Sequence, residues 1–182
     1  GVGYAAPGQW PHAGRDWTGG RVVFPHTTPE GDLVNLYGRA VSTTTPVPTA
    51  LRHEHLPGTT GYFNAQALRT GDGSLFICEG AFDALALMAA GYSRAALFGV
   101  HGWRWAWMPT VRALVFALDA DATGQQQWRT LARQAVLRGR RVAVLPPEAY
   151  GGYKDANAAW VAGVLTVGDW PETLRVEWPA EC

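Results

Sequence analysis

Lysine is almost absent from this sequence of 182 residues, because Lys154 is the single lysine among 15 basic residues. Arginine therefore carries nearly all of the positive charge, a bias that suits bidentate contacts to phosphate but also follows from a GC-rich genome. The basic residues are matched by 15 acidic ones, so the formal net charge is zero. This balance argues against a uniformly basic protein that coats nucleic acid, and it still allows a local basic groove.

Charge and cysteine are scarce as well. Charged residues make up 16% of the chain and hydrophobic residues 47%, so the chain can bury a core and is not a disordered linker. Two cysteines, Cys78 and Cys182, cannot form a four-cysteine zinc site. Cys78 lies in an apolar run that predicts a buried thiol. This cysteine usage fits the reducing cytoplasm, where we expect the protein to be located.

Long apolar runs are missing too. No stretch approaches the ~20 residues that a membrane-spanning helix needs, so we expect no membrane partner. Residues 1–20 mix glycine, proline, histidine and charge, which differs from a signal peptide. The chain begins with glycine rather than Met, which suggests that it was excised from a longer protein.

The first part of the chain, residues 1–72, predicts a small mixed α+β subdomain. Strands are expected at 21–24 and 33–37, and the proline- and glycine-containing turn between them makes a β-hairpin with a long loop. The remaining expectations are an aperiodic start (1–20), an extended crossing (42–48), a loop (52–64) and a helical turn (63–68). A Gly-Asp-Gly turn at 71–73 marks the boundary to a second domain, residues 73–182.

Strands and helices alternate in the second domain. We expect strands at 74–78, 94–100, 113–118 and 141–145, and helices at 81–90, 124–138 and 156–162, with a part-helical aromatic segment at 103–110. The strand segments are too apolar to be covered on one face only. The pattern therefore predicts an α/β fold, in which helices flank a parallel sheet.

Acidic side chains follow the ends of these strands. Glu79 comes directly after the strand at 74–78, Asp119 and Asp121 come after the strand at 113–118, and Asp155 follows the last strand through a glycine-rich loop. Ligands of parallel sheets bind at the carboxyl ends of the strands. The fifth carboxylate, that of Asp83, lies one helical turn beyond Glu79 and can face the same space.

Clustered carboxylates repel each other unless a cation joins them, and hard oxygen ligands suit Mg²⁺ or Mn²⁺. A single acid after a strand is better explained as a helix N-cap. A strand that ends in Glu-Gly beside another that ends in Asp-x-Asp favours a metal site instead. The sequence thus predicts divalent ions held by Glu79, Asp83, Asp119, Asp121 and Asp155.

Three segments resemble the motifs of Toprim domains. The run Cys78-Glu79-Gly80-Ala81-Phe82-Asp83 resembles their glutamate motif, and Asp119-Ala120-Asp121, followed by Gly124, resembles their Asp-x-Asp motif. Lys154-Asp155-Ala156-Asn157 resembles the third acidic element of primase Toprim domains, with Asn157 where a second acid often stands. Order and spacing agree over residues 74–160, and the resemblance implies the Toprim fold.

The segment before residue 74 resembles the N-terminal subdomain of bacterial replicative primases. Arg21-Val22-Val23-Phe24-Pro25 and Gly38-Arg39 match strands that frame a nucleotide and template groove there. A basic residue, usually Lys, precedes the stretch matching 61–68 in that family. Here either Arg52 or the pair His53 and His55 would take its place, or the role is absent. The zinc-binding module and helicase of the family have no counterpart in these residues, so both are expected as separate partners.

The resemblance implies a DNA primase catalytic core, which joins ribonucleoside triphosphates into RNA primers on a single-stranded DNA template. Glu79, Asp119 and Asp121 would be catalytic, with Glu79 acting as a ligand or as the general base. Phosphates would be contacted by Arg21, Arg39, Arg52 and Lys154, although Lys154 is equally well explained as a solvated loop lysine. The same resemblance leaves two other readings: a Toprim nuclease or topoisomerase module, and a noncatalytic scaffold that binds nucleic acid.

The tryptophans also have two explanations. Trp103, Trp105 and Trp107 alternate with an arginine and could stack template bases. In an apolar domain with nine tryptophans, core packing is the better explanation for Trp103 and Trp107. His12 and His26 have no partner at metal-ligand spacing and are expected to be structural.

Overall fold

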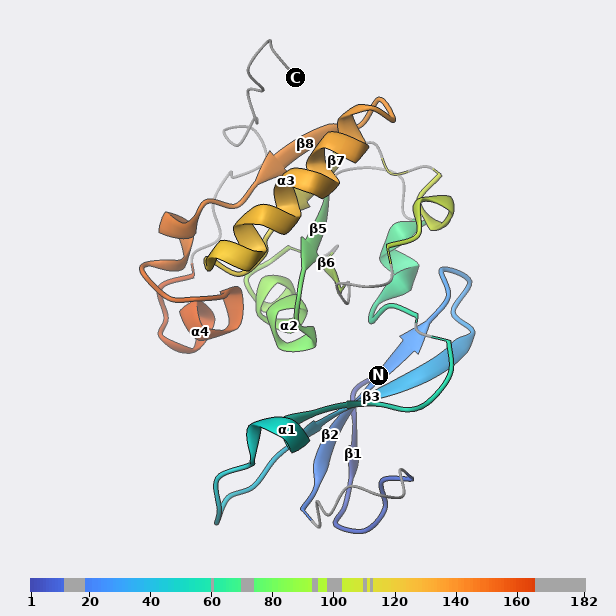
Figure 1. Ribbon diagram of the computed structural model, residues 1–182, viewed down its shortest axis with the longest axis vertical. Coiled ribbons are helices and arrows are strands. Elements are labelled where there is room, and N and C mark those ends of the chain that lie inside the picture. The colour runs from blue at the N-terminus through green and yellow to red at the C-terminus, as the bar shows by residue number, and fades with distance from the viewer. Residues whose placement is uncertain are drawn as a thin grey trace. The chain divides into compact units, whose positions relative to one another are not determined.

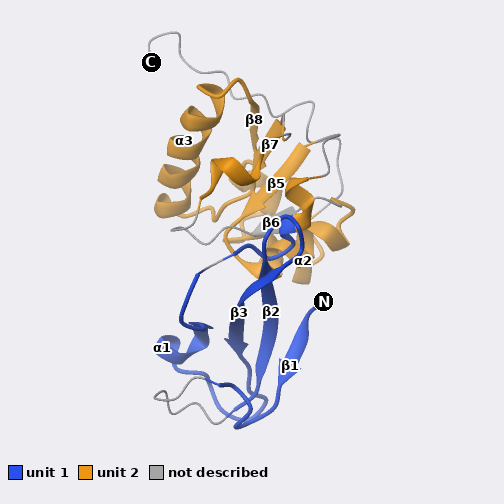
Figure 2. Ribbon diagram, turned by 90° about the vertical axis from the view of Figure 1, so that its right-hand side faces the viewer, with its two compact units in different colours: residues 1–65 blue, residues 66–182 orange. Residues whose placement is uncertain are grey.

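The computed structural model describes residues 1–11, 19–59, 61–69, 74–92, 95–97, 103–109, 111 and 113–165. The chain forms two compact units, unit 1 over residues 1–65 and unit 2 over residues 66–182 (Figure 2). The division between them thus falls before the boundary that the Gly-Asp-Gly turn suggested. The parts of the strand at 94–100 and of the aromatic segment that reach beyond these ranges lie outside the described residues, as do Cys182 and His12.

Unit 1 is built on an antiparallel sheet with the strand order β1-β2-β3-β4 (Figure 1). Its strands are β1 (Gly3–Ala5), β2 (Arg21–Thr27), β3 (Leu33–Ala40) and β4 (His53–His55). The expected hairpin of β2 and β3 is confirmed, and both strands run further than their apolar cores indicated. β4 lies inside the segment expected to be a loop, and β1 lies inside the aperiodic start. Strands of three residues are too short to produce a readable alternation.

The link between β3 and β4 is bent rather than extended. Ser42 Oγ accepts hydrogen bonds from the backbone N–H groups of Thr44 (3.2 Å) and Thr45 (3.0 Å), which turns the chain. A short helix, α1 (Thr49–Arg52), follows and leads into β4. The helical turn expected near 63–68 is present as the 3₁₀ helix η1 (Ala65–Leu68).

One face of the unit 1 sheet carries its aromatic core. Phe24 on β2 pairs with Tyr37 on β3, and the ring of Phe63 meets Phe24 edge-on at 5.4 Å between centroids. Phe24 is fully buried. Burial of an aromatic ring of this size contributes ~2–3 kcal/mol, so this cluster holds the hairpin and the segment near residue 63 together.

Unit 2 contains a parallel sheet with the order β6-β5-β7-β8. Its strands are β5 (Ser74–Cys78), β6 (Ala95–Leu97), β7 (Ala113–Phe116) and β8 (Arg141–Val144). The helices are α2 (Ala81–Ala89), α3 (Ala122–Val136) and α4 (Ala156–Val161), with 3₁₀ turns η2 (Trp105–Trp107) and η3 (Pro147–Tyr150). The alternation predicted from the sequence, and with it the flanked parallel sheet, is confirmed.

The order of the strands explains how the helices cover the sheet. β6 and β8 lie on opposite sides of the central pair, so right-handed crossovers place α2 and α3 on opposite faces (Figure 2). The central strands are accordingly buried on both faces, since all four residues of β7 and the last four of β5 are buried. Cys78 is among them, and its thiol is fully buried, as its apolar run predicted. None of the described helices is both long and apolar enough to cross a bilayer.

Candidate active site at the carboxyl edge of the parallel sheet

Glu79 and Asp119 meet where the central strands of unit 2 end. Glu79 directly follows β5, and Asp119 lies just beyond β7. Glu79 Oε1 accepts a hydrogen bond of 3.3 Å from the backbone N–H of Asp119. Partial burial, and secondly the nearby Asp119 carboxylate, raise the pKa of Glu79. The parallel register therefore brings together two acids that are separated widely in the sequence.

Lys154 lies between the two aspartates that follow β7. Its Nζ is 2.6 Å from Asp119 Oδ2 and 3.5 Å from Asp121 Oδ2. The backbone carbonyl of Lys154 also accepts a 2.7 Å hydrogen bond from the N–H of Ala120, which fixes the loop against the Asp-x-Asp segment. The hydrogen bond and charge of Asp119 raise the pKa of Lys154. The ammonium thus neutralises carboxylates that would otherwise repel each other.

Asp121 and Asp155 cap the helices that follow them. Asp121 Oδ1 accepts from the N–H of Gly124 at 3.0 Å, and Asp155 Oδ1 accepts from the N–H of Ala158 at 2.7 Å. The cap bond to Gly124 lowers the pKa of Asp121. Capping and cation binding are compatible, because Asp121 uses Oδ1 for the cap while Oδ2 faces the ammonium. The cap fixes the direction of the second oxygen.

Asp83 is the most deeply buried of the five acids, and it joins two helices. Its Oδ1 accepts a 2.9 Å hydrogen bond from the backbone N–H of Asn157, at the start of α4. A Cβ at Gly80 would lie 2.3 Å from Asp83 Oδ2, so only glycine leaves room for this carboxylate. Desolvation raises the pKa of Asp83 to about 7, and the charges of Asp155 and Asp119 add to the effect. Asp83 therefore ties α2 to α4 behind the other acids.

Two further residues shape this edge, Gly124 and Tyr150, and neither was predicted to be a site residue. A Cβ at Gly124 would lie 2.3 Å from the carbonyl oxygen of Asp119 and 3.0 Å from Glu79 Oε1, so glycine lets α3 approach the acids. The hydroxyl of Tyr150, on η3, donates to the carbonyl of Leu118 at 3.2 Å and so supports the segment that follows β7. The position of Gly124 behind the Asp-x-Asp motif could have pointed to its role, whereas no sequence pattern pointed to Tyr150.

The donor set fits a hard divalent cation. All candidate ligands are carboxylate oxygens, the kind that Mg²⁺ and Mn²⁺ prefer. Within the part of the chain that the structure describes, no three Asp, Glu, His or Cys side chains already stand in a metal-binding arrangement. The ammonium of Lys154 occupies the position between Asp119 and Asp121 instead. A divalent ion bound there would displace it.

The candidate phosphate ligands of unit 1 differ strongly in exposure. The side chain of Arg21 is 2% exposed, and it forms a 2.7 Å ion pair with Glu54 on β4. Its guanidinium also donates to the carbonyl of Gly38 at 3.3 Å and lies over the ring of Trp10. These internal partners give Arg21 a structural role in the sheet, on the face opposite the aromatic core. A direct phosphate contact by Arg21, as the sequence suggested, would require breaking this buried pair.

Arg39 and Arg52 are partly exposed, and Arg39 lies on the same face of the sheet as Phe24 and Tyr37. Arg39 contacts the ring of His53, whose Nδ1 is 2.7 Å from the hydroxyl of Tyr37. Burial, together with the charges of Arg39 and Arg52, lowers the pKa of His53 to about 4. The imidazole is therefore neutral at pH 7 and compatible with its cationic neighbours. The structure brings Arg39, Arg52 and His53 together, a grouping that the sequence only hinted at.

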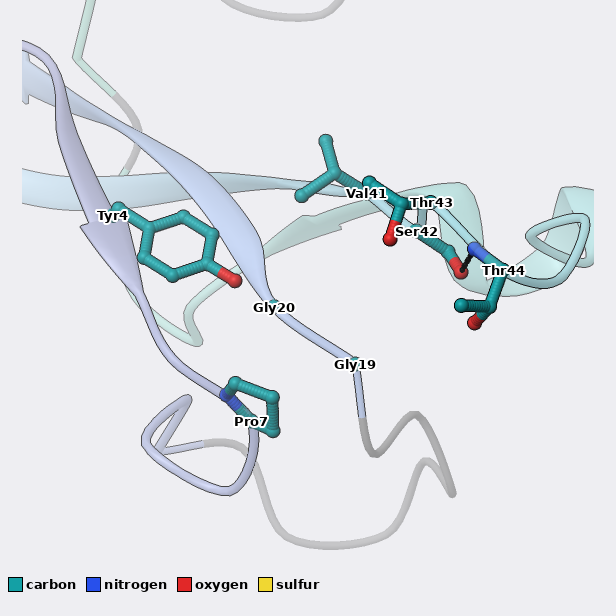
Figure 3. A pocket seen from close by; sticks show the side chains of 8 residues that line it. All are labelled: Tyr4, Pro7, Gly19, Gly20, Val41, Ser42, Thr43 and Thr44. Carbon is teal, nitrogen blue, oxygen red and sulfur yellow. Dashed lines mark hydrogen bonds between the residues drawn. The ribbon is translucent and has the colours of Figure 1, made fainter.

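Unit 1 also contains a pocket of about 280 Å³ between β1 and the loop after β3 (Figure 3). Tyr4, Gly20 and Ser42 are among its lining residues, and none of the lining residues is charged. A Cβ at Gly20 would overlap the phenol ring of Tyr4, so a larger residue there would require this exposed ring to move. None of the residues proposed as phosphate ligands lines this pocket.

Comparison with proteins of known structure identifies folds similar to this one. A DNA primase domain from Pseudomonas aeruginosa matches with a TM-score of 0.61 and 19% identity, covering 88% of this chain and 61% of that one. The RNA polymerase domain of Mycobacterium tuberculosis primase DnaG matches with a TM-score of 0.61 and 18% identity, over 94% of this chain and 60% of that one. The primase fragment of the bacteriophage T7 primase-helicase matches with a TM-score of 0.58 and 20% identity, over 80% of this chain and 59% of that one. The chain thus spans about three fifths of the length of each.

Sequence comparison adds the family. Among curated proteins, no sequence matches the chain. The Toprim domain family matches residues 74–174, which include the strands and acids of the site described above. Toprim domains bind divalent metal ions, generally Mg²⁺. With more than half of its length matched, this chain belongs to the Toprim family.

Proposed function

We propose that this chain is the catalytic core of a DNA primase of bacterial or phage type, which synthesises RNA primers on single-stranded DNA. The observation that carries the proposal is the extent of the structural likeness. Primase domains match 88% and 94% of the chain, so the likeness reaches into unit 1 as well as the Toprim unit. A Toprim fold alone would not distinguish a primase from the other enzymes that contain this domain.

The carboxyl edge supplies the groups that nucleotidyl transfer needs. We assign Asp119, Asp121 and Asp155 as ligands of Mg²⁺ or Mn²⁺, which would neutralise phosphate charge and activate the attacking hydroxyl. Glu79 would accept the proton of that 3′-hydroxyl, since its raised pKa brings it nearer to the working pH. Lys154, released from Asp119 and Asp121, would turn to the triphosphate of the incoming ribonucleotide.

Unit 1 would contribute phosphate contacts from its accessible arginines. Arg39 and Arg52 are proposed to bind template or triphosphate, because guanidinium groups form strong bidentate contacts with phosphate. Arg21 would support them from the opposite face of the sheet, through its buried pair with Glu54. Asp83 remains proposed as a metal ligand only if its hydrogen bond to the start of α4 opens.

The proposed partners follow from the same reading. A separate zinc-binding module would help to read the template, and a replicative helicase would deliver it; one solved relative contains zinc-binding and RNA polymerase domains together. A primase of this type would work in the cytoplasm, where it meets its template.

The deciding experiment is template-directed synthesis with labelled ribonucleotides on single-stranded DNA, in Mg²⁺ or Mn²⁺, with and without a zinc-binding module from a primase. We expect short RNA products that require both template and divalent ion, and that Asp119→Ala abolishes. Cleavage of the DNA without RNA synthesis would identify the nuclease alternative instead. Binding of DNA with neither activity would identify a noncatalytic scaffold.

A further inference from the structure

Charge is divided between the two ends of the unit 2 sheet. Every described carboxylate of unit 2 lies in a segment that follows the carboxyl end of a strand, namely Glu79, Asp83, Asp119, Asp121, Glu148 and Asp155. The described charged residues in the segments before the amino ends of β5, β7 and β8 are all cations. Arg69 precedes β5. The other four are Arg104 before β7, Arg138 and Arg140 between α3 and β8, and Arg141 at the first position of β8. We call these four arginines the amino-edge patch.

The patch lies far from the acidic cluster. α3 begins at Asp121, beside the acids, and runs back along the sheet for 15 residues before the chain reaches Arg138 (Figure 1). A helix of that length spans roughly 22 Å. Attraction between the two ends is largely screened over this distance at physiological salt. The amino-edge patch is therefore a separate electrostatic feature of the unit.

Tryptophan rings support three of the four arginines of the patch, Arg104, Arg138 and Arg140. The Arg138 guanidinium lies 4.6 Å from the centre of the Trp105 ring, and that of Arg140 lies 5.6 Å from it. Arg104 lies 4.4 Å from the centre of the Trp107 ring. Trp105 is itself anchored to α3, because its indole N–H donates to Gln134 Oε1 at 3.0 Å. Trp105 and Trp107 thus support arginine side chains, a role that differs from the stacking of template bases considered for them from the sequence.

The cations differ in how much of their binding capacity is used. The terminal nitrogens of Arg140 donate to the carbonyls of Val111 and Met108, while its buried Nε has no partner among the described residues. Partial burial of Arg140, together with the charge of Arg138, lowers its pKa. Arg138 donates to the carbonyl of Gln134 at 2.9 Å and is otherwise exposed. No described carboxylate forms an ion pair with Arg104, Arg138 or Arg141. These three guanidinium groups can accept an anionic partner.

We propose that the amino-edge patch binds the sugar–phosphate backbone of single-stranded nucleic acid, through Arg104, Arg138 and Arg141. Guanidinium groups that are prearranged on aromatic rings lose little freedom on binding, and their planar forks match phosphate oxygens. A nucleic-acid strand bound there would contact the amino edge of the sheet, at the opposite end of unit 2 from the acidic cluster. The proposal does not depend on the chemistry assigned to that edge.

The test is fluorescence anisotropy with a labelled single-stranded oligothymidylate, in EDTA and without nucleotides, over a range of salt concentrations. The variant is Arg104→Gln with Arg138→Gln. We expect the Kd to rise about tenfold near 100 mM salt, and the slope of log K against log salt to become shallower by roughly 0.7 for each arginine removed. Because no divalent ion is present, failure of the primase proposal would not alter this result.

α3 offers a matched control. Arg129 also stacks on a tryptophan, Trp128, at 4.9 Å, and also donates to the carbonyl four residues before it, but it lies in the middle of the helix. Arg129→Gln should therefore change the Kd by less than twofold. If it weakens binding as much as the double variant does, the patch has no special role and the proposal fails.

A further variant guards against misfolding. Arg141 is exposed at the start of β8, so Arg141→Gln tests the patch without disturbing the stack on Trp105. A threefold or greater rise in Kd supports the proposal. Unchanged affinity in both patch variants, with binding lost only in Arg39→Gln or Arg52→Gln, would overturn it and leave the patch as a docking site for an acidic protein.

Discussion

Lys154 Nζ lies 2.6 Å from Asp119 Oδ2 and 3.5 Å from Asp121 Oδ2, so a loop cation neutralises the carboxylates that follow β7. A divalent ion must compete with this ammonium. Lys154→Met should therefore tighten Mn²⁺ binding by roughly fivefold, because the contact of an exposed charge at this distance is worth about 1 kcal/mol in water. Titration with Mn²⁺ measures the change, with Lys154→Arg as the charge-retaining control. Weaker Mn²⁺ binding in Lys154→Met would mean that the lysine organises the site instead.

Asp121 performs two tasks that substitution can separate. Asp121→Asn keeps a good N-cap and removes the charge, whereas Asp121→Ala removes both and costs α3 about 1 kcal/mol. We expect both variants, like Asp119→Ala, to abolish ribonucleotide joining. Only Asp121→Ala should lower the thermal unfolding temperature. Activity of Asp121→Asn at saturating Mg²⁺ would refute the assignment of this carboxylate as a metal ligand.

We predict that Asp83 serves to hold α2 and α4 together. Its pKa of about 7 in the folded protein lies above the ordinary value of 3.8, so the folded state binds the extra proton and stability falls as the pH rises from about 4 through 7. Asp83→Asn keeps an acceptor for the N–H of Asn157 and removes this loss. Its unfolding temperature should exceed that of the parent at pH 8 and match it near pH 4.

The same variant tests the role in metal binding that the sequence suggested for Asp83. Mn²⁺ affinity should change by less than threefold if the carboxylate serves only α4. A loss of more than tenfold would restore Asp83 to the ligand set.

Unit 1 should lose stability in mild acid because of His26. The ring is 2% exposed, and within the described residues neither ring nitrogen has a hydrogen-bond partner. Burial, and secondly His55, lower its pKa from 6.5 to about 4. Between these two pKa values, His26 is protonated in the unfolded chain but neutral in the folded one. The free energy of unfolding should therefore be highest above pH 6.5 and fall by roughly 3 kcal/mol by pH 4.

His26→Phe checks this assignment. A ring without nitrogens removes both the titration and the unpaired buried groups, so denaturant unfolding of the variant should depend less on pH between 6.5 and 4. We also expect a modest gain in stability at pH 7, of ~1 kcal/mol. An unchanged pH profile would show that another group controls acid unfolding.

Arg21 and Arg39 should separate stability from activity. Arg21→Met removes the ion-pair partner of the buried Glu54, which costs about 3–5 kcal/mol in comparable sites, so the variant should unfold at much lower denaturant concentration. Arg39→Gln should leave unfolding unchanged and lower primer yield roughly ten- to a hundredfold, through loss of a charge-assisted contact of ~1.5–3 kcal/mol.

The double variant Arg21→Met with Glu54→Met provides the control, since it removes both charges and should recover much of the lost stability. Low primer yield in this double variant at full stability would revive a direct phosphate contact for Arg21. Normal yield in Arg39→Gln would count against the primase proposal itself.

Much of unit 2 was predictable because its signals are local. The apolar runs of β5 and β7 and the acids directly behind them define the sheet and its functional edge without knowledge of distant contacts. Asp83 shows the limit, because its bond to the backbone of Asn157 depends on how α2 packs against α4. Arg21 shows it again, since nothing near it in the sequence reveals that Glu54 will face it across β3 and neutralise it. Short strands such as β4 gain their structure from such pairings rather than from their own pattern.

Gly124 restricts how far this protein could be made more heat-resistant by redesign. Replacing a glycine in a helix with alanine usually gains ~1 kcal/mol, which makes the position an obvious target. Here the new methyl group would collide with the carbonyl oxygen of Asp119 at 2.3 Å and press on Glu79 at 3.0 Å. A weaker first turn of α3 is what allows the acids and the helix to share this space. Selections for thermostability should therefore collect changes elsewhere along α3 and leave residue 124 untouched.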